Sequence, residues 1–489
     1  MNFLLALLTS LLLTFSFPRF DLPWLMPVAM TPLLLASARE ERALWRFLAG
    51  WLAGAGTLAG VTDWIRFVIS FHGGLGTFGG LGAFLLYCLA KGLYFGVFAW
   101  LAGPVLRLAW AVPAVAALWV GVDITAGSAL FQWVTLGNAA ADMSIPMRLA
   151  PFAGVHALSF VFMMMSAAVA LVLLRRPRWH IAWLLSLPAL ILLPPLPEPE
   201  QPSARAVVLQ PNIDETREWT PQSLASSERE LAQLSLRGVL RAGLRKPDLL
   251  IWPELPAPFY YYDDPEFRQL AGGLAQATRT PFLLGTVAHT PQGAPLNSAL
   301  LLSPAGEPVA RYDKIHLVPF GEYVPWPFGF FNKITREVGD FAPGAAAITP
   351  PLGGHRIGTF ICYESAFPAL VRGFVRNGAE VLFNLSNDGY FGRSLSARGQ
   401  HLLVVRMRAA ENARWIVRAT NDGITASIDP AGRVIRSVPP FVETSGDLPY
   451  SYRTAQTFYS RHGDWFAWTC AALGLLSVLL ARRTPAASR

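Results

Sequence analysis

The sequence predicts a multi-domain membrane protein, an α-helical bundle of about eight transmembrane helices joined to a large α/β domain. Of its 489 residues, 53% are hydrophobic and only 15% are charged, whereas an average soluble protein carries about 25% charged residues. Long apolar runs fill the first part of the chain and recur near its end, while the middle alternates short apolar strands with helical stretches.

The transmembrane helices are expected in eight apolar segments, near residues 2–16, 21–37, 47–71, 79–101, 105–125, 150–174, 180–196 and 463–481. Most approach the roughly 20 residues with which a helix crosses a bilayer. Residues 1–196 would hold the first seven helices, and residues 463–481 the eighth. We interpret the first segment as a span rather than a signal peptide, because no basic residue precedes it and no small-residue cleavage pattern follows it. Three prolines interrupt the second segment: Pro23, Pro27 and Pro32.

Basic residues gather after alternate segments: Arg39, Arg42 and Arg46; Arg107; Arg175, Arg176 and Arg178; Arg482, Arg483 and Arg489. By the positive-inside rule both termini are then cytoplasmic, and the chain from about 197 to 463 lies on the outer side. The net charge of +8 is spread between the spans rather than gathered in one patch, which argues against a nucleic-acid partner. Two of the three cysteines lie inside apolar runs, so no disulfide framework is indicated.

Ionisable groups also occur inside or at the edge of the spans: Asp63, Arg66, Lys91 and Asp123. Such groups often mark a polar cavity, but Asp63 and Arg66 could simply pair, since they stand at helical i, i+3 spacing. Phe131 and Trp133 are typical of an aromatic belt at the membrane interface.

The segment from about 203 to 455 has the pattern of an α/β domain. Apolar strands are expected over 206–210, 248–252, 281–285, 298–302, 356–361, 381–384, 415–420 and 424–428, and helices near 221–244, 265–278, 366–377 and 396–413. Such alternation indicates a layered α/β domain. The run Pro197–Pro202 reads as a stiff linker out of the membrane.

A cysteine stands at one of these strand ends. The apolar strand 356–361 stops at Cys362, and a helix is expected from about Ser365. A thiol at that junction would face the positive end of a helix, which favours the thiolate, and the same N–H groups could bind an oxyanion. The alternative is a small apolar residue that ends a strand.

Two further strand ends carry charged side chains. Glu254 follows the strand 248–252, and Lys314 follows a β-hairpin strand, with Glu322 soon after it. A carboxylate beside an apolar strand suits a general base, and a fixed cation could stabilise a tetrahedral oxyanion. Taken singly, the glutamate could equally be a loop cap and the lysine a solvated surface charge.

Together, Glu254, Lys314 and Cys362 resemble, in that order, the Glu–Lys–Cys triad of the nitrilase, or carbon–nitrogen hydrolase, superfamily. The surrounding stretches 311–325, 361–364 and 384–392, set between apolar spans, resemble the apolipoprotein N-acyltransferase family of the bacterial cytoplasmic membrane. The likeness covers nearly the whole chain and is strongest over about 204–431. It implies a nitrilase-like αββα sandwich in the periplasm, carried on an eight-helix membrane domain.

The resemblance also assigns roles. It implies that Cys362 is the nucleophile, Glu254 the general base and Lys314 the oxyanion-stabilising residue. The supporting positions that it implies are Trp219, Glu322, Tyr363 and Glu364. One departure stands at Asp388-Gly389-Tyr390, where the family more usually has Ala-Trp after the aspartate.

The implied reaction moves an acyl chain from a phospholipid to a diacylglyceryl apolipoprotein, by way of a thioester. It needs no cofactor, and no histidine has the spacing of a metal ligand; a monomer is expected. Two other functions share some of the features. A membrane-anchored amidase or nitrilase would pass the acyl group to water, and a non-catalytic transporter or scaffold would leave the triad unexplained.

Two other segments bear on the site. The run Val324–Phe331 is apolar and punctuated by proline and glycine, so it could be a lid or a membrane-facing arm, or a packed loop. On the expected helix 396–413 and just after it, solvated ion pairs are predicted at His401, Arg406, Arg408, Glu411 and Arg414.

Overall fold

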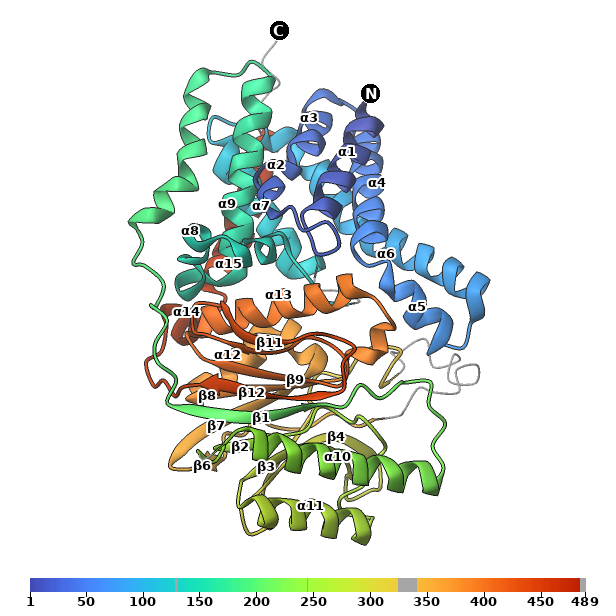
Figure 1. Ribbon diagram of the computed structural model, residues 1–489. Helices are drawn as coiled ribbons and strands as arrows, with labels where there is room; N and C mark the ends of the chain where they lie inside the picture. The colour runs from blue at the N-terminus through green and yellow to red at the C-terminus, as the bar shows by residue number, and fades with distance from the viewer. Residues whose placement is uncertain (128–130, 244, 324–340, 484–489) are drawn as a thin grey trace.

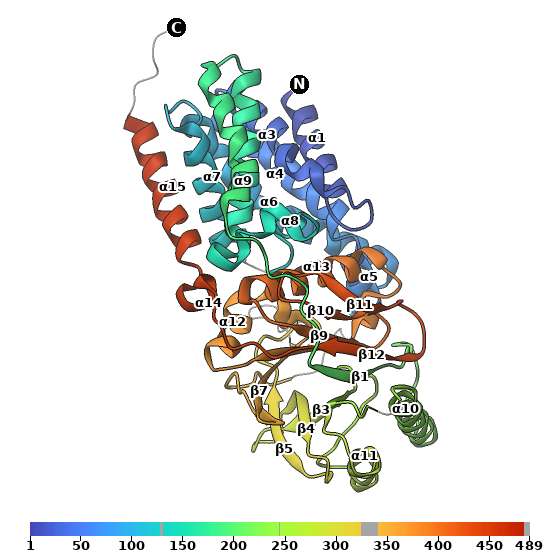
Figure 2. The same cartoon turned by 60° about the vertical axis from the view of Figure 1, so that its left-hand side comes forward.

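The computed structural model describes residues 1–127, 131–243, 245–323 and 341–483. Figure 1 shows a helical part, made of the N-terminal helices and the last helix, and an α/β part made from the middle of the chain. The chain passes between them as a long extended segment after residue 192, and it returns through α14 (Phe458–His462) to α15 (Trp465–Arg483). The N-terminus and the C-terminal end of α15 lie at the end of the helical part remote from the α/β part (Figures 1 and 2).

The helical part contains α1 (Asn2–Phe15), α2 (Met26–Ala29), α3 (Thr31–Arg39), α4 (Ala43–Val61), α5 (Trp64–Phe71), α6 (Gly76–Val105), α7 (Ala111–Val122), α8 (Ser144–Met147) and α9 (Ala150–Leu173). Among the described residues, α6, α9 and α15 are long and apolar enough to cross a bilayer, and the pair α4–α5, bent by 72°, is a fourth candidate. Shorter apolar helices cover residues 2–15, 111–127 and 178–192.

A helical membrane part is therefore confirmed, with three to four candidate spans among the described residues. The second predicted segment is divided into a 3-10 turn and two short helices, each with proline in its first turn. Proline fits that position because it has no N–H to leave unpaired, and it interrupts a helix elsewhere.

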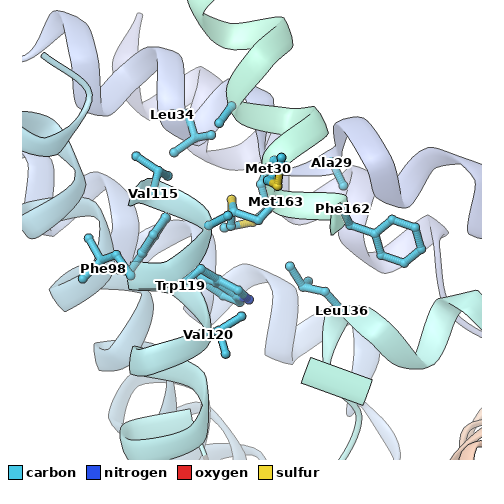
Figure 3. Close-up of a cluster of buried hydrophobic side chains, with 14 of the residues drawn as sticks. Ala29, Met30, Leu34, Phe98, Val115, Trp119, Val120, Leu136, Phe162 and Met163 are labelled. Atoms are coloured by element: carbon cyan, nitrogen blue, oxygen red, sulfur yellow. The ribbon is translucent and has the colours of Figure 1, made fainter. Parts of the chain in front are cut away.

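The helices pack closely because small residues face each other. A Cβ atom added to Gly50 of α4 would lie 2.5 Å from the Cβ of Ala99 on α6, and one added to Gly54 would lie 2.7 Å from the carbonyl oxygen of Gly92. Small residues four apart allow two membrane helices to approach in this way. Deeper in the bundle, Trp119 of α7 lies among Phe98, Val115 and other apolar side chains (Figure 3).

One ion pair of the helical part differs from the pair that helical spacing predicts. Asp63 forms an ion pair with Arg19 at 3.0 Å, not with Arg66 as the spacing suggested. Lys91 and Asp123 are buried, with His156 of α9 3.4 Å from Asp123. They line a cavity among the helices, as expected for ionisable groups in a membrane.

The α/β part contains two six-stranded sheets within the described ranges. The first has the order β12-β1-β2-β3-β4-β5, with β1 (Ala204–Gln210), β2 (Leu249–Ile251), β3 (Phe282–His289), β4 (Pro295–Leu302), β5 (Pro308–Asp313) and β12 (Thr444–Tyr450). The second has the order β11-β10-β9-β8-β7-β6, with β6 (Pro351–Leu352), β7 (His355–Ile361), β8 (Val381–Ser386), β9 (Ile416–Thr420), β10 (Thr425–Ile428) and β11 (Val434–Val438).

The two sheets form the middle of a four-layer αββα sandwich. Helices α10 (Pro221–Arg241) and α11 (Pro265–Thr278) cover the first sheet on the side away from the membrane part (Figure 1). Helices α12 (Pro368–Arg376) and α13 (Leu395–Asn412) cover the second sheet and lie between it and the membrane helices (Figure 2). Apolar side chains of both sheets meet in one buried cluster, so the expected α/β sandwich is confirmed.

Candidate active site

The three residues of the predicted triad follow strands of different sheets. Glu254 comes three residues after β2 and Lys314 directly after β5, both in the first sheet, while Cys362 directly follows β7 of the second. The fold brings them to one place: Lys314 bonds Glu254, and both charges act on the Cys362 thiol. The site therefore lies at the ends of strands from both sheets.

Lys314 is the buried centre of this group, with 1% of its surface exposed. Its Nζ donates to Glu254 Oε1 at 3.0 Å and to Glu322 Oε1 at 2.9 Å. Burial alone would lower the pKa of Lys314, but the two facing carboxylates outweigh it and hold the pKa well above its usual value. Lys314 is thus a cation that is almost completely buried.

The carboxylate of Glu254 is fixed by three donors. Besides Lys314, Oε1 accepts from Asn297 Nδ2 at 2.8 Å, and Oε2 accepts the backbone N–H of Asn387 at 2.9 Å. The same Asn297 nitrogen reaches Glu322 Oε1 at 2.8 Å. A carboxylate held on both oxygens cannot turn away from its neighbours, which is what a general base in a narrow site requires.

Cys362 has an unusual backbone conformation, with φ 49° in the left-handed region. Non-glycine residues seldom adopt it, and such strain is concentrated at functional sites. Burial raises the pKa of the thiol, Glu254 raises it further, and Lys314 opposes both. The resting group is therefore a neutral thiol.

The expected stabilisation of a thiolate by a helix start is wrong for this resting state. Cys362 opens a 3-10 turn, Cys362–Ala366, and α12 begins only at Pro368. A single short turn carries little of the dipole that the sequence argument relied on, and burial prevails. The nucleophile needs a base beside it.

Glu364 connects the nucleophile to the lysine loop. It is fully buried, and its Oε2 accepts the N–H of Ile361 at 2.7 Å, while Oε1 accepts the Tyr312 hydroxyl and the Ile315 N–H, each at 2.7 Å. Burial raises the pKa of Glu364 to about 7, although these donors oppose the rise. Glu364 fixes the strand that ends at Cys362 against the residues around Lys314.

Tyr363 connects the nucleophile to the membrane part instead. Its hydroxyl oxygen accepts the Gln132 N–H at 2.9 Å, and its ring stacks on Phe131 with centroids 4.8 Å apart. Phe131 and the buried Trp133 are consequently part of the contact between the two parts, and the interpretation of these two rings as an aromatic belt is wrong.

Trp219 lies apart from this group. Its described contacts are with the Arg217 guanidinium, 5.2 Å from the ring centroid, and with the apolar cluster on the outer face of the first sheet. Of the other supporting residues, Glu322 bonds Lys314 and Glu364 bonds the backbone beside Cys362 and Lys314, whereas Tyr363 follows Cys362 directly in the chain and bonds Gln132.

The prediction of solvated pairs on α13 is also wrong. His401, Arg408 and Glu411 are buried, as is Arg414 just beyond the helix. Arg408 Nε lies 2.9 Å from Glu411 Oε2, and Glu411 Oε1 accepts the Val155 N–H of the membrane part at 2.9 Å. These charges are buried because α13 lies between the second sheet and the membrane helices.

Three polar residues close to the site had not been singled out for it: Asn297, Asn387 and His401. Asn297 is a lone amide in the otherwise apolar strand β4, and Asn387 follows β8, so each stands where a polar side chain is out of place in a buried run. That position is the signal that could have revealed them.

Two cavities lie near the site, although Glu254, Lys314 and Cys362 are not among the residues that line them. One, of 450 Å³, is lined by Tyr363, Ile315 and further apolar residues; the other, of 510 Å³, extends among the membrane helices. Gln132, His316 and Phe367 line both. The segment Val324–Phe331, expected to be a lid or an arm, lies outside the described residues.

Residues 205–454 match the family model of carbon-nitrogen hydrolases, and residues 9–168 match the model of the apolipoprotein N-acyltransferase N-terminal domain. The fold and the site accordingly define a carbon–nitrogen hydrolase domain carried on a membrane domain. Among solved structures, Saccharomyces cerevisiae Nit3, a member of branch 10 of the nitrilase superfamily, is 17% identical with a TM-score of 0.40, over 50% of this chain and 90% of that one.

Relatives match along the whole length. The apolipoprotein N-acyltransferase of Geobacter metallireducens is 34% identical over 99% of this chain and 95% of that protein. The apolipoprotein N-acyltransferase of Azotobacter vinelandii is 33% identical over 99% and 96%. The chain belongs to the apolipoprotein N-acyltransferase family.

Proposed function

We propose that this chain is an enzyme that transfers an acyl chain from a phospholipid to the N-terminal amine of a diacylglyceryl-cysteine apolipoprotein, the last step of lipoprotein maturation. Full-length relatives named apolipoprotein N-acyltransferase support the activity. The observation that carries the mechanism is the buried, permanently charged Lys314 held between Glu254 and Glu322, beside a neutral thiol.

In the first half-reaction Cys362 attacks the carbonyl carbon of the phospholipid ester. Because the thiol is protonated at rest, Glu254 takes its proton as the sulfur–carbon bond forms. Lys314 and a backbone N–H stabilise the tetrahedral oxyanion. The ester carbon–oxygen bond then breaks, the proton passes from Glu254 to the leaving oxygen, and a lysophospholipid departs from the thioester.

In the second half-reaction the α-amino group of the acceptor attacks the thioester. Glu254 accepts a proton from the nitrogen, the carbon–sulfur bond breaks, and the proton returns to the Cys362 sulfur. The product is an amide, and the enzyme regains its resting thiol. Such a ping-pong order requires that water does not reach the thioester first. The largely apolar lining of the 450 Å³ cavity supports this requirement.

The proposal also includes the membrane arrangement. We infer eight spans: α6, α9, α15 and the bent pair α4–α5, completed by the shorter helices α1 and α7, the divided segment α2–α3 and the segment 178–192. We also infer that both termini lie in the cytoplasm and the catalytic domain in the periplasm. The arginines that follow alternate segments support it. So does the position of the N-terminus and of the C-terminal end of α15 at the end of the helical part remote from the α/β part (Figures 1 and 2). We propose residues 1–196, 203–455 and 463–481 as the domain boundaries, in the bacterial inner membrane, and a monomer.

A two-stage transfer tests the function. Purified enzyme in detergent micelles is first incubated with acyl-labelled phospholipid, and a synthetic diacylglyceryl-cysteine peptide is then added. The label should move from the protein to the peptide amine in an amide that resists hydroxylamine. A peptide with an acetylated N-terminus is the matched control and should receive no label. Release of the label as free fatty acid at the same rate with either peptide would show a hydrolase instead.

A further inference from the structure

One buried titratable side chain beside the nucleophile has no part in the mechanism above. His401, on α13, is fully buried. Its Nε2 lies 3.1 Å from the carbonyl oxygen of Cys362 and 3.0 Å from the Ser365 hydroxyl. On the other side of the ring, Nδ1 lies 3.1 Å from an Arg418 nitrogen and 3.2 Å from Asp388 Oδ1.

These contacts fix which nitrogen carries the proton. Nδ1 faces the acceptor Asp388 Oδ1 at 3.2 Å, but an Arg418 nitrogen, which can only donate, lies closer at 3.1 Å, and the Cys362 carbonyl oxygen, which can only accept, faces Nε2; these last two contacts favour the proton on Nε2. Burial, together with the neighbouring Arg418, lowers the pKa of His401, which keeps the ring neutral. Nδ1 is then an acceptor for Arg418, which also holds Asp388 Oδ1 at 2.7 Å. The rings of Trp133 and Phe391 pack against the imidazole, with centroids 5.5 Å and 5.9 Å from its own, and restrict its rotation.

We propose that His401 is a positioning residue for the oxyanion site: its Nε2–H, bonded to the Cys362 carbonyl, orients and polarises the Cys362–Tyr363 peptide, whose N–H joins Lys314 in binding the oxyanion. The inference rests on the proposed function.

Two features of the turn support this role. Cys362 has a φ of 49°, a conformation that the surrounding structure must maintain. The hydrogen bond from His401 holds the carbonyl oxygen of this same residue. Tyr363 stands in the first turn of a 3-10 helix, where N–H groups have no acceptor within the helix.

The chemistry of the peptide completes the argument. In a trans peptide the N–H points opposite to the carbonyl oxygen, so the Tyr363 N–H is directed away from His401. Donation to the carbonyl draws electron density from the amide, and linked hydrogen bonds of this kind strengthen each other in a buried site. The Tyr363 N–H therefore becomes a better donor to an oxyanion.

Two substitutions of His401 distinguish a role in positioning the oxyanion site from a purely structural role in packing. His401→Gln keeps a donor near the position of Nε2, while His401→Asn keeps a polar group only near the position of Nδ1. Arg418 and Asp388 pair with each other at 2.7 Å, so neither variant leaves their charges without a partner. Two reactions of the Cys362 thiol are then compared: alkylation by iodoacetamide, which forms no oxyanion, and acylation by a labelled phospholipid, which does. Peptide mass spectrometry reads both at Cys362.

His401→Asn should alkylate at the wild-type rate but acylate about 10-fold more slowly, less than the roughly 100- to 1,000-fold loss when an oxyanion donor is removed outright. The acylation KM should change little, and His401→Gln should restore most of the rate. Equal losses in alkylation and acylation, or wild-type acylation by His401→Asn, would overturn the inference. If wild-type enzyme itself forms no acyl adduct, the proposed function fails, and that outcome is distinct.

Discussion

Replacing Lys314 by methionine is the sharpest perturbation of the site. Methionine has nearly the same length and no charge, so it keeps the packing and removes both ion pairs. Glu254 Oε1 and Glu322 Oε1 lie 3.0 Å and 2.9 Å from the same lysine nitrogen, so the substitution leaves the buried Glu254 and the partly buried Glu322 without the cation that both contact. Removing one partner from a buried ion pair costs about 3–5 kcal/mol.

That cost should depend on pH. Two like charges in one buried space cannot both ionise easily, so the variant should raise the folded-state pKa of one carboxyl above its unfolded value of about 4.3. A raised folded-state pKa gives stability that is present below the unfolded pKa and is lost as pH rises through the folded one. The loss of stability of Lys314→Met relative to wild type should therefore be small at pH 5 and reach its full size at pH 8.

Melting temperatures in detergent at pH 5 and pH 8 measure this deficit, with the exposed Lys246→Met as the matched control, for which no change is expected. Acylation of Cys362 by phospholipid should also fall about 100- to 1,000-fold, since the variant lacks a fixed cation for the oxyanion. A deficit equal at both pH values, or acylation at the wild-type rate, would refute the role of Lys314 as the cation shared by the two carboxyl groups.

Three further predictions concern packing, the junction of the two parts and pH. Gly50→Ala should destabilise the enzyme by about 1–3 kcal/mol because its Cβ would collide with α6, while Gly82→Ala, which meets open space, should leave the melting temperature unchanged. Tyr363→Phe leaves the Gln132 N–H without its acceptor and should cost about 0.5–1.5 kcal/mol; an unchanged melting temperature would argue against the contact. Burial raises the pKa of Glu364 to about 7, so the wild type should lose stability as pH rises from about 4.5 through 7. Glu364→Gln should show a shallower slope, since Glu215 and Asp422, whose pKa values burial also raises, remain in the variant; an identical pH profile would contradict the prediction.

Much of the α/β part could be predicted from the sequence because its signals are local. An apolar run bounded by polar residues forms a strand, and β1, β2, β7 and β8 lie close to where the runs placed them. Cys362 directly follows such a run for the same reason. The partner of β1 on its outer side, β12, was not anticipated, because its polar sequence is stabilised only by pairing with β1 along seven residues.

The membrane part was harder, because hydropathy measures composition and not continuity. Thr62 and Asp63 separate α4 from α5, and the chain bends there although the apolar run continues. Trp133 reads as an interfacial residue until the α/β part covers it. His401 reads as a surface residue until α13 is placed between sheet and helices. The bend after α4 and the burial of Trp133 and His401 all depend on contacts between distant parts of the chain. A local sequence pattern does not predict such contacts.

The central claim is that the acyl chain is held as a thioester on the Cys362 sulfur, and the position of that acyl group can be measured directly. Enzyme incubated with phospholipid alone and digested under conditions that preserve thioesters should carry a hydroxylamine-sensitive acyl group on the peptide that contains Cys362. Cys362→Ser should carry no such group. An acyl group found instead on Cys88 or Cys470, or a wild-type rate of transfer in the Cys362→Ser enzyme, would contradict the account.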